Sequence, residues 1–227
     1  MRSIDKGVNL IPFRNYRDAM PNLVARVGCY CCYCEMEISN EPDIEHVQPK
    51  SNGGAVYLWE NFLLGCKKCN DIKSNKNPDR NNYLWPDEDN TSAAYEYNEI
   101  FVKAIPGLAA PISAYAQNTL TLTGIDRVPS NIVKPTKKDK KDPRWQKRKV
   151  AWGKAQRAYT NWQTNRSQEL AETIGELAHS SGFYSIWVKI FASEPLVLQS
   201  IKMLYPSTYE PIANPLGGFV LRHGGRF

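Results

Sequence analysis

The sequence lacks the features of membrane and secreted proteins, and it has little histidine. No apolar run approaches the roughly 18 residues that a membrane-spanning helix needs, so we expect no membrane association. The stretch MRSIDKGVNLIPFRNY has no apolar core of the kind found in a secretion signal, which predicts a cytoplasmic protein. No cysteine follows Cys69, and there are three histidines in 227 residues. A disulfide framework spread along the chain is therefore excluded.

All six cysteines lie between Cys29 and Cys69. In a reducing cytosol, cysteines clustered at CxxC spacing are more often metal ligands than disulfides. GCKKCN supplies one unambiguous pair, Cys66 with Cys69. The stretch GCYCCYCEMEI offers two overlapping pairs, Cys29 with Cys32 and Cys31 with Cys34.

Two such pairs give the four thiolates of a closed tetrahedral zinc site, which predicts a structural zinc. Consecutive extended residues face opposite ways, so adjacent Cys31 and Cys32 would not serve one site together. That argument leaves the pair of Cys29 and Cys32 open.

Positive charge is concentrated in one segment. The chain carries a net charge of +6, and the segment from Lys134 to Arg157 alone holds eleven Lys or Arg and two Asp. The remaining residues are therefore slightly acidic in sum. This distribution indicates a localised surface for a polyanion or an acidic partner.

The pattern along the chain predicts an α+β protein. Residues 15–27 are typical of a short helix with a proline break, and residues 29–76 are turn-rich and need a metal to fold. The segment SAAYEYNEIFVKAI predicts a hairpin around Asn98-Glu99. Helices are expected at 112–122, from Asp142 onward, around 170–177 with a cap at Gly182, and through FYSIWVKIFA, before an irregular tail. We therefore expect a small zinc-stapled core in residues 1–90 and a mainly helical part in residues 91–227.

The helix that begins at DPRWQKRK carries an aromatic stripe. Its members are Trp145, Trp152, Ala155, Tyr159 and Trp162, and their spacing predicts a core-facing side.

Basic residues such as Lys147 and Arg148 lie off that stripe, where they form a solvated face. This face could contact a phosphate backbone without reading sequence, or dock an acidic patch on a partner.

Between the cysteine pairs lies IEHVQPKSNGGAVYLWENFLLGCKKCNDIK, which resembles the HNH endonuclease motif. The usual pattern is an acid or His, then His, then xxP(K/R)xxGG, then NLxLLCxxC(H/N)xxK. The matching residues are Glu45, His46, Pro49, Lys50, Gly53, Gly54, Asn61, Cys66, Cys69, Asn70 and Lys73, with Phe62 in place of the leucine. The resemblance implies a ββα-metal core fastened by two cysteine pairs. The first pair in such proteins reads C-x-Y-C, which assigns Cys31 and Cys34 to zinc.

Phosphodiester hydrolysis needs a base and a cation, and the motif offers both. His46 is the motif's one histidine and suits the base. Glu45 and Asn70 offer oxygen ligands, a hard and weakly charged set that favours Mg²⁺ or Mn²⁺ over a softer metal. By resemblance, Asn61 braces the loop that carries His46.

Four basic residues are candidates for contact with nucleic acid: Lys50, Lys73, Lys147 and Arg148. His179, at a helix end, and His223, in the glycine-rich tail, lie outside any catalytic context.

The flanking segments MRSIDKG, NYLWPDEDN, LTGIDR and GFYSIWVKIF resemble the PtuB family, the HNH subunits of Septu anti-phage systems that also occur with some retrons. This resemblance implies an SMC/ABC-like ATPase partner and a role in antiviral defence. The expected substrate is nucleic acid, with DNA as the default and RNA as an alternative, since nothing encodes base readout. A second hypothesis is a zinc-stabilised nucleic-acid-binding adaptor with an inactive site.

Overall fold

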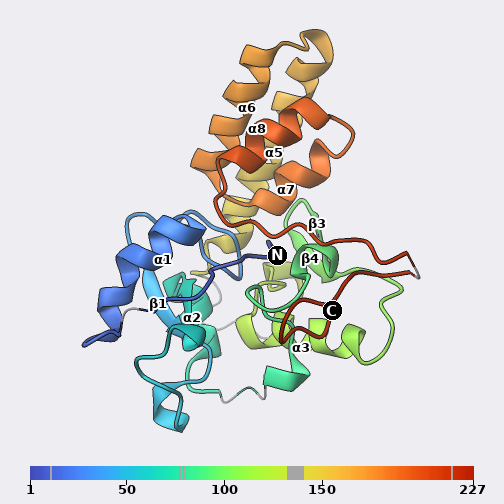
Figure 1. The fold of residues 1–227 in the computed structure, drawn as a ribbon. Helices are drawn as coiled ribbons and strands as arrows, with labels where there is room; N and C mark the ends of the chain where they lie inside the picture. Colours follow the sequence, from blue (N-terminus) through green and yellow to red (C-terminus); the bar gives the residue numbers. More distant parts are fainter. Residues whose placement is uncertain (11, 77, 79, 132–140, 216) are drawn as a thin grey trace.

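Two small sheets and a larger set of helices make up this α+β protein (Figure 1). The computed structural model describes residues 1–10, 12–76, 78, 80–131, 141–215 and 217–227. The strands are β1 (Asp43–His46), β2 (Phe62–Gly65), β3 (Tyr95–Asn98) and β4 (Phe101–Ala104). The α-helices are α1 (Met20–Val27), α2 (Lys67–Lys73), α3 (Ile112–Thr123), α5 (Arg144–Thr164), α6 (Gln168–Ser181), α7 (Tyr184–Ile190) and α8 (Pro195–Met203). Short 3-10 helices are η1 (Tyr16–Ala19), η2 (Lys50–Asn52), η3 (Trp59–Asn61), η4 (Arg80–Asn82), η5 (Thr91–Ala93) and η6 (Pro129–Asn131).

The first sheet and the helix that follows it form a ββα unit. Strand β1 runs antiparallel to β2, with Glu45 opposite Leu63 and His46 opposite Phe62. All four residues of β2 are buried, as expected of a strand covered on both faces. Cys66 follows the strand directly and caps α2, its sulfur accepting the N–H of Cys69. This arrangement places the second cysteine pair directly at the start of the helix.

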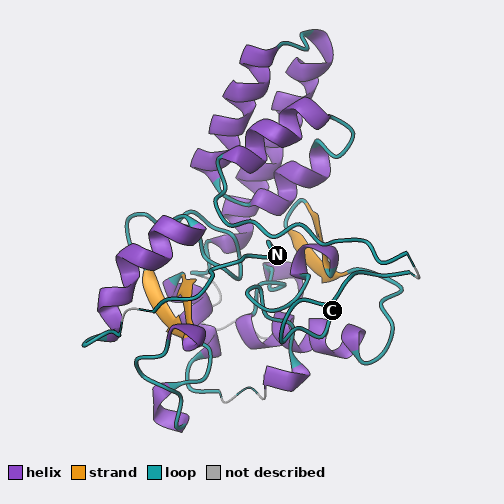
Figure 2. Ribbon diagram, viewed as in Figure 1, coloured by secondary structure: helices purple, strands orange, loops and turns teal. Residues whose placement is uncertain are grey.

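The predicted hairpin is confirmed in the second sheet, which is separate from the first (Figure 2). Strands β3 and β4 pair antiparallel, and Glu99 adopts φ +52° in the connecting turn. Tyr97 and Val102 face the core from this hairpin. Helix α3 ends at Gly124, whose φ of +60° gives the left-handed cap that glycine tolerates best.

Helices α5 to α8 form a bundle that extends away from the ββα unit (Figure 1). The predicted helix start at Asp142 lies close to the start of α5, and the predicted cap at Gly182 directly follows the end of α6. Helix α8 was not predicted. The buried face of α5 differs from the predicted aromatic stripe. It consists of Arg144, Arg148, Ala151, Ala155, Ala158 and Trp162.

The buried face of α5 is rotated away from the predicted aromatic stripe because of side-chain size. The three alanines on the buried face let neighbouring helices approach, whereas Trp145, Trp152 and Tyr159 lie half-buried at its margin. Trp162 is buried as predicted, and its Nε1 donates to Glu194 at 2.7 Å.

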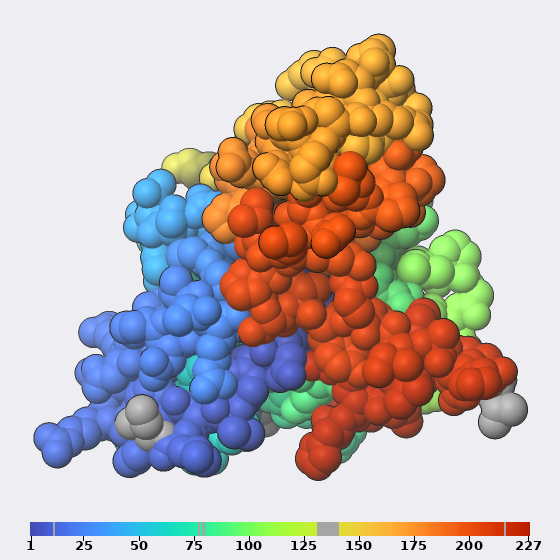
Figure 3. Space-filling model, turned by 45° about the horizontal axis from the view of Figure 1, so that its top comes forward, coloured from blue at the N-terminus to red at the C-terminus, as the bar shows by residue number. Residues whose placement is uncertain are grey.

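The C-terminal tail returns to the N-terminal segment, and the two lie side by side (Figures 1 and 3). Ile4 bridges Thr208, and the N–H of Tyr209 donates to the carbonyl of Ser3. Arg222 donates to four backbone carbonyls, those of Ile4, Pro86, Asp87 and Asp89. One continuous hydrophobic core includes residues on both sides of position 90. The predicted boundary between residues 90 and 91 is thus crossed by packing and by hydrogen bonds.

Within the part of the chain that the structure describes, no helix combines the length and the apolar character needed to cross a bilayer. The predicted basic segment from Lys134 to Arg157 is described from residue 141 onward, and its residues 134–140 lie outside the described part.

Candidate metal centre and candidate active site

Four cysteine sulfurs meet in one buried cluster. The Sγ atoms of Cys31, Cys34, Cys66 and Cys69 all lie within 4.8 Å of one another. In each pair the second residue turns its backbone N–H toward the first sulfur, at 3.5 Å for Cys34 to Cys31 and 3.4 Å for Cys69 to Cys66. The turn of the first pair and the start of α2 thus form two matching knuckles.

The spacing of this cluster fits a tetrahedral zinc ion. A Zn–S bond of about 2.3 Å implies neighbouring sulfurs about 3.8 Å apart, and the Sγ atoms of Cys34 and Cys66 are 3.7 Å apart. Burial raises the pKa of Cys34 and Cys69, which makes four thiolates without a cation unfavourable. A divalent cation would offset that cost.

The two remaining cysteines lie outside this cluster. Cys32 is buried, and its N–H donates to the carbonyl of Leu64 at 2.8 Å. Burial raises the pKa of Cys32 to about 11. Cys29 is half-buried. The alternative pair that the sequence left open is not the one that the fold brings to Cys66 and Cys69.

Arg144, at the start of α5, joins the cysteine cluster to the helical part of the chain. Its Nη1 donates to the sulfur of Cys69 at 3.0 Å and to the carbonyl of Thr123, and its Nη2 donates to the carbonyl of Gly124. Asp142 accepts from Nε and Nη2 of the same guanidinium. Burial opposes this charge, but Cys69 and Asp142 outweigh it, so the pKa of Arg144 lies above its ordinary value. Sequence reasoning did not anticipate this contact.

His46 ends β1 with its imidazole held from three sides. The rings of Tyr16 and Phe62 each lie 5.1 Å from the imidazole, edge to face. The Nε2 atom lies 3.2 Å from the carbonyl oxygen of Val56. Because a carbonyl can only accept, the neutral ring carries its proton on Nε2 and keeps the lone pair on Nδ1. Burial, aided by Lys50 and Lys73, lowers the pKa of His46 and favours this neutral form.

Asn61 fixes the loop that follows His46. Its Oδ1 accepts the N–H of Gln48, and its Nδ2 donates to the carbonyls of Gln48 and Ala55, all between 2.8 and 3.0 Å. The loop also needs its two glycines. Gly53 has φ +79°, and a Cβ on Gly54 would lie 2.0 Å from the carbonyl oxygen of Gln48. The amide and the glycines together fix the loop, and with it the carbonyl of Val56 beside the imidazole.

A cavity of about 340 Å³ brings His46 together with the predicted cation ligands Glu45 and Asn70. Asp43 and Glu45 lie on the face of β1 that α2 covers, and His46 lies on the other, because side chains alternate along a strand. The cavity reaches both faces at the edge of the strand. A phosphate group there would meet an imidazole on one side and oxygen donors on the other.

The order of these elements matches a known domain. Residues 29–76 match the model of the HNH endonuclease family. The match spans both cysteine pairs, β1, β2 and α2, whereas α3 and the bundle lie outside it. No curated protein matches the chain.

Within the HNH segment, Asp43 is a candidate ligand that sequence reasoning missed. Its Oδ2 lies 2.6 Å from Nδ2 of Asn70, and both residues line the cavity with His46. The signal was available in the alternation of β1, which sets Asp43 on the same face as Glu45. Asp43 is exposed, so its carboxylate is open to a cation from solvent.

The structure corrects the predicted phosphate contact of Lys73. The lysine is 1% exposed, and its Nζ lies 2.6 Å from Oε1 of Glu45 and 2.8 Å from the carbonyl oxygen of His46. Its charge is therefore committed to β1 and not available to a substrate. Burial raises the pKa of Glu45 to about 7, against the opposing effect of Lys73. The pair also occupies one oxygen of the carboxylate predicted to hold a cation.

Arg148 also departs from its predicted place on a solvated face. It is fully buried in α5, with Nε donating to the carbonyl of Ile100 at 3.0 Å, so it cannot contact nucleic acid. Lys50 and Lys147 are exposed, as a phosphate contact requires. His179 packs against the edges of Tyr30 and Tyr205, and His223 is exposed in the tail.

Proposed function

We propose that this chain is a metal-dependent HNH endonuclease that hydrolyses phosphodiester bonds of nucleic acid, with DNA as its substrate. The observation that carries the proposal is the hydrogen bond from His46 Nε2 to Val56, which leaves the lone pair of a base on Nδ1 of a histidine that lines one cavity with Asp43 and Asn70. A base of this kind activates the water that attacks phosphorus. Support also comes from the match of residues 29–76 to the HNH endonuclease family.

The oxygen donors of the cavity suit a hard divalent cation. Asp43, Asn70 and, if it is shared with Lys73, Glu45 would hold Mg²⁺ or Mn²⁺. The bound cation would stabilise the negative charge that develops on the phosphate and on the leaving oxygen. Lys73 fixes the backbone of β1, and Asn61 keeps the loop of the base in position. Lys50, exposed at the rim of the same cavity, supplies a positive charge for the substrate phosphate.

The cysteine cluster would hold a structural zinc. Four buried sulfurs close the coordination sphere, so such an ion has no open position for substrate. Its role is to fasten the turn of the first pair to the start of α2, and thereby to set β1 and α2 at a fixed separation.

The flanking segments of the chain suggest a biological role for the proposed nuclease. By their resemblance to PtuB, the chain would be the nuclease effector of an antiviral defence complex that an SMC/ABC-like ATPase subunit regulates. This part rests on the resemblance alone.

A nicking assay tests the catalytic proposal. Supercoiled plasmid is incubated with the protein and Mg²⁺ or Mn²⁺, with chelator controls. We expect His46→Ala to lower the nicking rate by about 10²- to 10⁴-fold, the usual contribution of a general base. The matched control, His223→Ala, removes an exposed histidine and leaves the rate unchanged. Undiminished cleavage by the His46 variant would refute the assigned base.

A second candidate is a zinc-stabilised nucleic-acid-binding adaptor without activity. The buried ion pair of Glu45 with Lys73 favours it, because that pair competes with a cation for the carboxylate. The adaptor would bind plasmid and leave it supercoiled with either metal, and with the ATPase present as well. Asp43→Asn separates the two candidates further, since in an active nuclease it raises the Mg²⁺ concentration needed for half-maximal nicking.

A further inference from the structure

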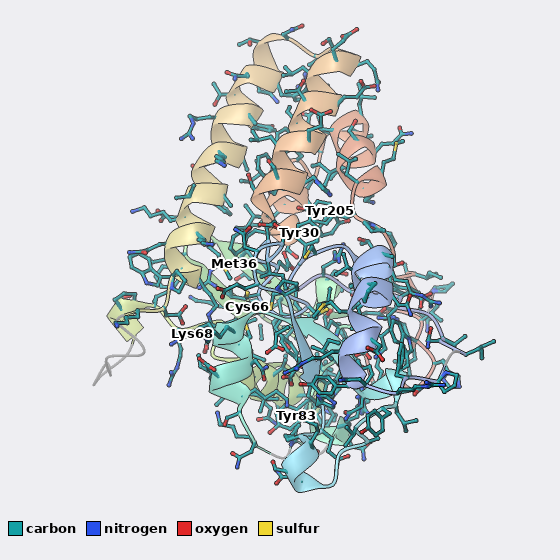
Figure 4. The ribbon with its side chains drawn as sticks, turned by 90° about the vertical axis from the view of Figure 1, so that its left-hand side faces the viewer. Tyr30, Met36, Cys66, Lys68, Tyr83 and Tyr205 are labelled. Atoms are coloured by element: carbon teal, nitrogen blue, oxygen red, sulfur yellow. The ribbon has the colours of Figure 1, made fainter. Side chains whose placement is uncertain are left out.

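A groove outside the candidate active site lies between the HNH segment and the bundle. It has a volume of about 590 Å³ and is bordered by the loop after the first cysteine pair, the start of α2 and the start of α5. We call it the α2–α5 groove. Figure 4 shows Met36, Cys66 and Lys68 gathered where α2 approaches the lower end of α5. A second hollow of about 270 Å³ continues the groove along α5 and shares Met36, Glu37 and Lys147 with it.

Lysines dominate two walls of this groove. Lys67 and Lys68 come from α2, Lys141 precedes α5, and Lys147 and Lys154 lie on α5. Glu37, Glu41 and Asp71 also border the groove, so four lysines face three acids there, and the adjoining hollow adds Lys154.

Three of these lysines are available to a ligand. Lys67, Lys141 and Lys147 are exposed, and none of them has an ion-pair partner among the described residues. One of the acids is in part already used, since Oε1 of Glu37 accepts the N–H of Ser39 at 2.6 Å. Asp71 is the one acid among the described residues of the α2 and α5 walls, so these walls carry a net positive charge.

The α2–α5 groove adjoins the candidate active site through α2. Lys67, Lys68 and Asp71 line the groove, whereas Asn70 and Ser74 of the same stretch line the cavity of His46. Helix α2 has seven residues and is therefore about 10 Å long. A polymer with a charge at every nucleotide could lie in the groove and enter the cavity within a few nucleotides.

We propose that the α2–α5 groove binds the sugar–phosphate backbone of the nucleic acid and leads it to the HNH cavity. This inference rests on the proposed function. Among the described residues that line the groove there is no aromatic side chain on which a base could stack, so it binds the backbone and does not read sequence. Helix α5 lies outside the HNH match, so this part of the substrate site is contributed by the helical region.

The test compares two triple variants with equal loss of charge. In the groove variant, Lys67, Lys141 and Lys147 become Gln. In the control, Lys103, Lys189 and Lys202, exposed on β4, α7 and α8, become Gln. Both are made in the His46→Ala background, and anisotropy measures binding to fluorescein-labelled duplex DNA, single-stranded DNA and RNA over a range of salt concentrations.

We expect the groove variant to bind duplex DNA about 100-fold more weakly near physiological salt, with the slope of log K against log salt reduced by about 2.7 for three lost contacts. On single strands the slope falls by about 2. The control variant keeps the parent affinity and slope. The nucleic acid whose binding falls most identifies the form that the groove holds. Equal affinity of the groove variant and the control for all three probes would overturn the inference.

A second readout separates failure of the groove from failure of the nuclease proposal. With His46 restored, the groove variant is assayed on bis(p-nitrophenyl) phosphate, which is too small to reach the groove. We expect parent and groove variant to hydrolyse it at equal rates with Mn²⁺. Hydrolysis by the parent combined with unchanged nucleic-acid binding by the variant rejects the groove alone. Absence of both hydrolysis and binding in the parent rejects the nuclease, and the groove with it.

Discussion

At the scale of single residues, buried charged side chains link the cysteine cluster to the helical part of this protein. The guanidinium of Arg144 donates its N–H groups to one sulfur, two carbonyls and one carboxylate, and the residue is 1% exposed. A zinc ion with four thiolates has a net charge of −2, so a guanidinium against Cys69 lowers the cost of burying that charge. Arg148 lies one turn further along α5 and is also fully buried. The two arginines place positive charge beside the cysteine cluster from the helical part of the chain.

Replacing Arg144 should therefore weaken zinc retention. In Arg144→Met, the sulfur of Cys69 loses its donor and Asp142 is left buried without its partner, which destabilises the fold by about 3–5 kcal/mol. The double variant Arg144→Met with Asp142→Asn removes the unpaired charge and recovers part of that stability. We expect both variants to release zinc to a colorimetric chelator faster than the parent does.

The control for this prediction is Lys149→Met on the same helix, where an exposed ion pair to Glu99 contributes little. Parent-like zinc release from the double variant would show that Arg144 acts on the fold and not on the sulfur.

The residues of the site were predictable to the extent that spacing identifies them. The two CxxC pairs and the order of His46, Asn61 and Asn70 follow from the sequence, and the fold brings them to one unit. The burial of Lys73 and Arg148 could not be predicted from the sequence, because the charge of a side chain does not tell whether the folded core offers it a hydrogen-bond acceptor. Asp43 was missed because the motif draws attention to the residue next to the histidine, whereas a strand also presents the residue two positions away from Glu45.

At the scale of elements, close approach of helices decides which small residues are required. Helices α6 and α8 pack against each other, and a Cβ on Gly175 of α6 would lie 2.9 Å from the carbonyl oxygen of Ser200 in α8. Gly153 of α5 has room instead, since its Cβ would meet no atom nearer than 3.5 Å. Both glycines lie inside helices, but only one is needed for packing.

Alanine at these two glycines should therefore change stability in opposite directions. Gly175→Ala forces α6 away from α8 and lowers the free energy of unfolding by about 1–3 kcal/mol. Gly153→Ala keeps its contacts and raises it by about 0.5–1 kcal/mol, because alanine favours the helix over the unfolded chain. Urea denaturation followed by circular dichroism measures both. Destabilisation by both substitutions to the same degree would contradict the packing argument.

The elements themselves were largely predictable where local signals are strong. The hairpin at Asn98-Glu99, α3 and the end of α6 at Gly182 agree with the sequence patterns. The buried face of α5 did not agree, because large aromatic residues signal a core, whereas three alanines, Trp162 and two buried arginines occupy it. Helix α8 was missed, although Pro195 in its first turn is a signal for the start of a helix.

At the scale of the whole molecule, the HNH segment and the bundle share buried polar contacts. Glu35, in the turn after the first cysteine pair, accepts from the backbone N–H and the hydroxyl of Ser185 at the start of α7, at 2.8 and 2.6 Å. Its own carbonyl accepts the N–H of Phe183 at 2.7 Å. The rings of Tyr30 and Tyr205 contact each other nearby, with centroids 4.7 Å apart, and both residues are labelled at the base of the bundle in Figure 4. The turn after the first cysteine pair therefore supports α7, and the second cysteine pair, through Arg144, supports the start of α5.

Loss of the metal should consequently reach beyond the HNH segment. We expect Cys66→Ser, or treatment of the parent with a strong chelator, to abolish bound zinc and to expose amides in residues 29–76, since metal binding supplies much of that segment's stability. Hydrogen exchange read by mass spectrometry should also show lost protection in α7 and in the first turns of α5, the elements that Glu35 and Arg144 hold. Helices α6 and α8, which pack on each other, should lose less. Cys29→Ser, outside the cluster, serves as the control and should keep both zinc and protection. If α7 and the start of α5 kept full protection while residues 29–76 opened, the two parts would fold independently, and the contacts across position 90 would not couple them.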